Sequence, residues 1–186
     1  LEKVYGGHPD AALQAGLTDT VSAILSCDFK RGSDGSLRVS IILGDMGWKP
    51  DVVEAVKRKT GGNSMMLSKG KGIKAGNLPM SQYKRRKGEI HGDGYYIPNL
   101  SKTREHPHVM FDTNLWKTRV YNALSVPDGT PGAITLYSGK ASEHKTIALH
   151  FISESATVTE GYGRKVLEFK LPPSKPDNHW WDALVG

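Results

Sequence analysis

Residues 37 to 62 read LRVSIILGDMGWKPDVVEAVKRKTGG, and their pattern of apolar, glycine and proline residues indicates the fold class. The apolar run at 37–43 predicts a strand buried on both faces, which ends at Gly44-Asp45. Pro50, with three valines behind it, predicts a short helix that closes at Gly61-Gly62. A strand, a loop and a helix in this order indicate an α/β domain in which the strand end carries Asp45.

The same spacing rules predict further helices and strands along the chain. The expected elements are a helix after Pro9, a strand over 63–68, an irregular basic segment over 69–87, a helix begun by Asp112 or Thr113, a strand over 133–137, a helix over 142–154, a hairpin of 156–160 with 165–171, and a last helix capped by Asp177. Helices and strands therefore alternate through most of the chain.

Length and composition favour one domain, residues 1–186. No stretch approaches the ~20 apolar residues of a membrane span, and no signal peptide is evident, so we expect an intracellular protein without a membrane partner. Cys27 is the sole cysteine, which excludes an internal disulfide and a thiolate zinc cluster. Any metal would then bind oxygen or imidazole ligands.

The net charge of +6 and the pI near 9.3 are compatible with a polyanionic partner such as DNA. Many of the cations fall in one glycine-rich segment, which is the candidate phosphate-contacting surface. They are Lys69, Lys71, Lys74, Lys84, Arg85, Arg86 and Lys87. The alternative is a loop that these side chains merely keep soluble.

Two groups of residues could carry chemistry. Asp45 follows a strand, at the sheet edge where α/β proteins usually hold ligands, although such an aspartate can also cap the next helix. In Asp177-Asn178-His179-Trp180-Trp181-Asp182, positions 179 and 182 share a helical face and Asp177 lies one turn earlier. These side chains could ligate a divalent cation together with Asp45, or they could be a helix cap and a solvated polar face.

Other enzyme classes are poorly supported by the sequence. It contains no Gly-x-Ser-x-Gly elbow, and Cys27 has no obvious base nearby, so nucleophilic catalysis is discounted. Gly70-Lys71-Gly72 lacks the spacing of an ATPase phosphate loop. Asp28 follows the first expected helix and is assigned to the surface rather than to the site.

Seven blocks occur in one order along the chain. They are Leu43-Gly44-Asp45-Met46-Gly47-Trp48, Ser68-Lys69-Gly70-Lys71-Gly72-Ile73, Phe111-Asp112-Thr113-Asn114-Leu115-Trp116-Lys117, residues 144–154, Thr159-Glu160-Gly161-Tyr162-Gly163-Arg164, Glu168-Phe169-Lys170, and Asp177-Asn178-His179-Trp180-Trp181-Asp182-Ala183-Leu184. In this order they resemble the nuclease part of the lambda-like terminase large subunit family, and the resemblance spans most of the chain.

The resemblance implies an RNase H-like fold with a mixed central sheet flanked by helices, and clustered acids that bind two divalent metals, Mg²⁺ or Mn²⁺. Asp45 matches the acid of the family's second catalytic segment, and the region of His179 and Asp182 matches the last one. Lys71 matches a lysine-glycine element near the site. His179 stands where relatives often carry an acid, and an imidazole ligand would favour Mn²⁺ or another transition metal.

The family also carries a packaging ATPase before the nuclease and a first catalytic aspartate on the first strand. Neither is found here, so both are expected upstream, and the fragment alone would lack part of its metal site. The implied function is a two-metal endodeoxyribonuclease that cuts concatemeric double-stranded DNA during packaging. The implied partners are the terminase small subunit and the portal protein, in the cytoplasm of a bacterial host.

Two alternatives stay open. One is a catalytically silent RNase H-like domain that binds nucleic acid without needing Asp45. The other is a transposase or Holliday-junction resolvase, which shares the fold and the metal chemistry; the order of the blocks speaks against it.

Overall fold

The computed structural model describes residues 8–30, 32, 35–99, 106–174 and 177–186. The chain divides into two compact units. Unit 1 comprises residues 1–69, 87–90 and 97–110, and unit 2 comprises residues 70–86, 91–96 and 111–186. Within the described ranges, no helix has the length and apolar character needed to cross a bilayer.

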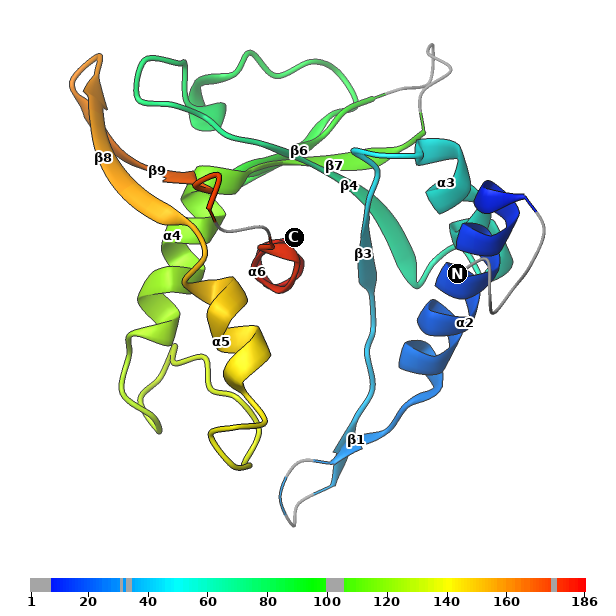
Figure 1. The fold of residues 1–186 in the computed structure, drawn as a ribbon. Coiled ribbons are helices and arrows are strands. Elements are labelled where there is room, and N and C mark those ends of the chain that lie inside the picture. Colours follow the sequence, from blue (N-terminus) through cyan, green and yellow to red (C-terminus); the bar gives the residue numbers. More distant parts are fainter. Residues whose placement is uncertain (1–7, 31, 33–34, 100–105, 175–176) are drawn as a thin grey trace. The chain divides into compact units, whose positions relative to one another are not determined.

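Helices and strands alternate along the chain (Figure 1), as expected for an α/β protein. The helices are α2 Pro9–Ser26, α3 Pro50–Lys59, the 3-10 helix η1 Met80–Gln82, α4 Thr113–Leu124, α5 Lys145–Phe151 and α6 His179–Val185. The strands are β1 Phe29–Lys30, β2 Ser36–Leu37, β3 Ile42–Asp45, β4 Met65–Lys71, β5 Ile90–Gly92, β6 Tyr95–Ile97, β7 His108–Asp112, β8 Ser155–Gly161 and β9 Arg164–Lys170.

The main sheet has five strands in the order β3-β4-β7-β6-β5. Strand β3 is parallel to β4 and pairs Ile42 with Met65 and Asp45 with Ser68. The short strands β1 and β2 form one antiparallel pair, and β8 and β9 form another. The crossover from β3 through α3 to the parallel β4 is the connection that the sequence predicts for residues 37–68.

The core of unit 1 lies between its two helices and the first strands of the sheet. It consists of Val21, Val53, Val56, Met65 and Leu67, and Val56 and Leu67 are fully buried. A Cβ at Gly44 would collide with the Met65 side chain and lie 3.0 Å from Cγ1 of Val53. Glycine at this position therefore lets β3 approach α3 closely, immediately before Asp45.

The prediction of a strand over residues 37–43, buried on both faces, is wrong in extent and in burial. Leu37 belongs to β2, and β3 begins only at Ile42. The side chains alternate between half-buried and exposed along β3, and Leu43 is 41% exposed. The physical reason is the position of β3 at an end of the sheet order, where a strand has a paired neighbour on one side only.

The core of unit 2 forms around Trp181 of α6, which is 1% exposed and packs against the rings of Phe151 and Phe169. Trp180, the neighbouring residue on α6, is instead 55% exposed. The hairpin β8–β9 and helix α4 are confirmed.

Three expectations for unit 2 are corrected. Residues 133–137 form no strand, because Ile134 donates a hydrogen bond to Ala123 at the end of α4 instead of joining a ladder. The helix expected over 142–154 is shortened to α5. Asp177 does not cap α6, whose N-cap is Asn178 and has no side-chain capping bond.

Candidate functional site

Asp45 is the last residue of β3, and its local geometry holds the carboxylate in an exposed position. Its Oδ1 accepts a hydrogen bond from the amide of Gly47 at 2.9 Å. The amide of Met46 donates to the carbonyl of the buried Ser68 at 2.9 Å, which fixes the strand end to β4. A Cβ at Gly47 would lie 3.2 Å from Oδ1 of Asp45, so glycine leaves the carboxylate room.

The alternative role for Asp45, capping of helix α3, does not occur. The N-cap of α3 is Lys49, in a left-handed conformation with φ 55°, and Pro50 follows it as the first helical residue. The ammonium of Lys49 forms an ion pair with Asp10 at 2.8 Å. Asp45 instead closes a turn of its own, so helix capping does not account for a carboxylate at this strand end.

Two of the predicted ligands in unit 2 lie together at the start of α6. Nε2 of His179 is 3.4 Å from Oδ1 of Asp177, and both side chains are more than half exposed. The His150 ring lies 6.3 Å from the His179 ring, and Nδ1 of His150 accepts a hydrogen bond from the Trp180 amide. His150 is therefore a further imidazole beside this group, and no pattern in the sequence singles it out as a site residue.

Asp182, the other ligand predicted on α6, is paired with a lysine. Its Oδ1 is 2.8 Å from Nζ of Lys117, and its side chain is 51% exposed. Lys117 also lies 2.6 Å and 2.7 Å from the two carboxylate oxygens of Glu154. Two carboxylates thus share one ammonium, the buried one of Glu154 and the half-exposed one of Asp182.

Glu154 anchors this cluster from within the protein. Its side chain is 5% exposed, and it accepts hydrogen bonds from Asn178 at 2.6 Å and from Nε1 of Trp181 at 3.1 Å. A buried carboxylate needs such compensation, because an unpaired buried charge is strongly unfavourable. No local pattern signals these contacts, since Lys117 and Glu154 are 37 residues apart.

The basic segment begins where β4 passes close to the start of α4. A Cβ at Gly70 would lie 2.5 Å from Cγ2 of Thr113, and a Cβ at Gly72 would lie 3.4 Å from Oγ1 of the same residue. Gly70 therefore permits this close approach, whereas a Cβ at Gly72 would make an ordinary contact. Lys71 between them is exposed, with Nζ 5.7 Å from the centre of the Tyr83 ring. The other cations predicted to contact DNA are also exposed: Lys69, Lys74, Lys84, Arg85 and Arg86.

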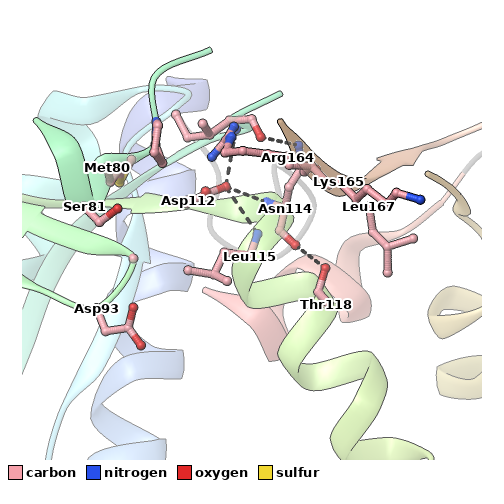
Figure 2. Close-up of a pocket in the computed structure, with 14 residues that line it drawn as sticks. Met80, Ser81, Asp93, Asp112, Asn114, Leu115, Thr118, Arg164, Lys165 and Leu167 are labelled. Carbon is pink, nitrogen blue, oxygen red and sulfur yellow. Dashed lines mark hydrogen bonds between the residues drawn. The ribbon is translucent and has the colours of Figure 1, made fainter. Parts of the chain in front are cut away.

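Asp112 joins this segment to α4 and lines a pocket of about 550 Å³ in unit 2 (Figure 2). Its Oδ1 accepts hydrogen bonds from the amides of Ile73, Asn114 and Leu115. Burial raises the pKa of the Asp112 carboxyl above its usual range, against the lowering effect of these amides. This carboxylate is used to cap α4 and hold the Ile73 loop, as the sequence predicted for the helix start.

The donor set predicted for a metal has the right chemistry for a divalent cation. Asp45, Asp177 and Asp182 offer carboxylate oxygens and His179 offers an imidazole, all on exposed side chains. Among the residues described, no three His, Cys, Asp or Glu side chains are grouped closely enough to hold an ion. Asp45 belongs to unit 1 and the other three to unit 2, and their convergence stays a prediction.

The chain matches a known protein family over nearly all of its length. A family model described as "Terminase large subunit gpA, endonuclease domain" matches residues 3–186. No curated protein and no solved structure gives a significant match. The mixed α/β architecture is consistent with an RNase H-like nuclease fold, and the family supports a DNA endonuclease role in genome packaging. Because the match covers almost the whole chain, the chain belongs to the endonuclease domain family of the phage terminase large subunit.

Proposed function

We propose that this chain is a metal-dependent DNA endonuclease domain that cuts concatemeric DNA during packaging. The observation that carries the proposal is Asp45, an exposed carboxylate at a strand end, held by the Gly47 amide and not used to cap α3. A ligand site at the carboxyl end of a parallel strand is the usual arrangement in α/β proteins. The family description supplies the reaction class, phosphodiester hydrolysis.

In this proposal Asp45, Asp177, His179 and Asp182 are the metal ligands, and Asp45, His179 and Asp182 are the catalytic residues. Two bound divalent cations, Mg²⁺ or Mn²⁺, would activate water and stabilise the leaving oxygen. Lys117 orients Asp182 through their 2.8 Å ion pair, and the buried Glu154 holds Lys117 in place. Asp182 is the more exposed of the two carboxylates on Lys117, so it is the one that can face a cation.

The basic segment would bind the phosphate backbone of double-stranded DNA without reading its bases. Its exposed cations Lys69, Lys71, Lys74, Lys84, Arg85 and Arg86 support this role. By family membership we further propose the terminase small subunit and the portal protein as partners, in the cytoplasm of the bacterial host.

The experiment is Mn²⁺-dependent nicking of plasmid DNA by the full-length protein, with Asp45→Asn and Lys69→Ala compared. The amide keeps the shape of the side chain and removes the charge that a cation needs, so Asp45→Asn should abolish cutting. Lys69→Ala should keep cutting and lower the salt dependence of binding by about one counterion. A folded Asp45→Asn variant that cuts as well as the parent would favour the silent nucleic-acid-binding alternative.

A further inference from the structure

The turn of the hairpin β8–β9 carries Tyr162, an aromatic residue that this type of turn does not favour and that does not pack into the core. Gly161 pairs with Arg164, so Tyr162 and Gly163 form a two-residue loop. Both have positive φ, 49° at Tyr162 and 70° at Gly163, as in type I′ hairpins, which strongly prefer Asn-Gly. A positive φ is unfavourable for tyrosine, and Tyr162 is 88% exposed, so burial of its ring does not compensate for the strained backbone.

The hairpin tip is braced against the basic segment within unit 2. The guanidinium of Arg164 donates hydrogen bonds to the backbone carbonyls of Lys74 at 2.8 Å and Asn77 at 3.0 Å. A Cβ at Gly161 would lie 3.0 Å from the backbone nitrogen of Gly76, so the two segments touch at that point. Tyr162 is thereby held on a fixed support beside the loop of residues 74–77.

Two exposed lysines belong to the segments that meet at this tip. Lys74 is on the loop and Lys165 is on the hairpin. Lys165 is paired with Glu160 at 2.8 Å, and both of these side chains are largely exposed, so solvent screens the pair. An exposed ring with cations beside it fits DNA, because phosphates pair with the cations while base and sugar surfaces stack on the ring.

We propose that Tyr162 wedges its ring from a groove between two base pairs of double-stranded DNA, while Lys74 and Lys165 contact the flanking phosphates. This inference rests on the proposed function only in taking duplex DNA as the substrate. The contact is tolerant of sequence, because any base-pair step that is partly unstacked offers aromatic faces to the ring. The two glycines flanking Tyr162 leave the ring free of neighbouring side chains along the turn.

The test measures binding of the full-length protein to a labelled DNA duplex by fluorescence anisotropy in EDTA, where no metal-dependent cutting occurs. Tyr162→Asn keeps a residue that suits the turn and removes the ring, and it should weaken binding about 5- to 100-fold. Tyr162→Phe should bind like the parent. Tyr137→Asn is the matched control, because Tyr137 is also exposed, at 69%, and should leave binding unchanged.

The dependence on salt distinguishes the ring from the cations. Tyr162→Asn should leave the slope of log Kd against log salt unchanged, whereas Lys74→Ala should reduce the slope by about one. Thermal unfolding of Tyr162→Asn should occur at or above the parental Tm, which separates a DNA contact from a structural role.

Binding of Tyr162→Asn within about twofold of the parent, or a parent that does not bind the duplex, would overturn the inference. The proposed catalytic function is tested separately, because the binding assay contains no metal. That function would be rejected if the Asp45→Asn variant still cut DNA in Mn²⁺. Cutting lost in Asp45→Asn together with normal binding by Tyr162→Asn would reject the tyrosine contact alone.

Discussion

Nζ of Lys117 lies 2.8 Å from Oδ1 of Asp182, although the two residues are 65 positions apart in the sequence. The same ammonium is held by the buried Glu154. The ion pair therefore links the exposed end of the proposed metal-binding group to the interior of unit 2. Glu154 is buried and Asp182 is half exposed, so replacing each carboxylate should lower the free energy of unfolding by a different amount.

Glu154→Gln should destabilise the protein far more than Asp182→Asn. Glu154 is 5% exposed and satisfies Lys117, Asn178 and Trp181, and breaking a buried ion pair costs about 3–5 kcal/mol. Asp182 is half exposed, and solvent screening limits its contribution to about 1 kcal/mol or less. Urea unfolding of the two variants measures the difference; equal losses would show that Glu154 is not the structural anchor.

Gly70→Ala should destabilise the protein by about 1–3 kcal/mol, because the new Cβ would collide with Cγ2 of Thr113. Gly76→Ala is the matched control on the same basic segment, since a Cβ there meets nothing within 4 Å and its cost should be near zero. Thermal unfolding measures both. Similar Tm values for the two variants would contradict the close approach of β4 to α4.

Because of Asp112, the free energy of unfolding should fall as the pH rises above the ordinary pKa of an aspartate. Burial raises its pKa in the folded protein, so the unfolded chain loses the proton first, and deprotonation favours the unfolded state. The loss begins near pH ~3.9 and ends once the pH exceeds the raised pKa. Asp112→Asn keeps a capping oxygen and should flatten this dependence, measured by urea unfolding across the acidic range.

Asp112→Ala should behave differently from Asp112→Asn at neutral pH. Alanine removes the acceptor for the amides of Ile73, Asn114 and Leu115, and loss of such a cap costs about 0.5–2 kcal/mol. The free energy of unfolding should therefore fall less in the asparagine variant than in the alanine variant. If both lose the same stability at neutral pH, the capping bonds are not what Asp112 contributes.

The sequence predicted the elements whose signals are local. Pro9 and Pro50 mark the starts of α2 and α3, and Asp112 caps α4, because proline geometry and side-chain capping act within one helical turn. The hairpin β8–β9 was also predicted, since alternation and glycines stand side by side in the sequence.

Elements that depend on distant partners were missed or misplaced. Strands β5, β6 and β7 are short and have no clear alternation, so their pairing, not their sequence, defines them. The extent of β3 depends on its pairing with β4, which apolar content alone does not reveal. In the candidate site, Asp45 and Asp182 were named from the sequence, whereas Lys117 and Glu154 were not, because tertiary contacts alone bring them together.

A crystal structure of the full-length protein soaked in Mn²⁺, with the ions located by anomalous scattering, tests whether these side chains share one metal site. We expect two ions about 3.5–4 Å apart, with Asp45 and Asp182 among their ligands and His179 or Asp177 beside them. Ions bound without Asp45, or an Asp45 carboxylate farther than roughly 8 Å from both His179 and Asp182, twice the two-metal spacing, would contradict this expectation.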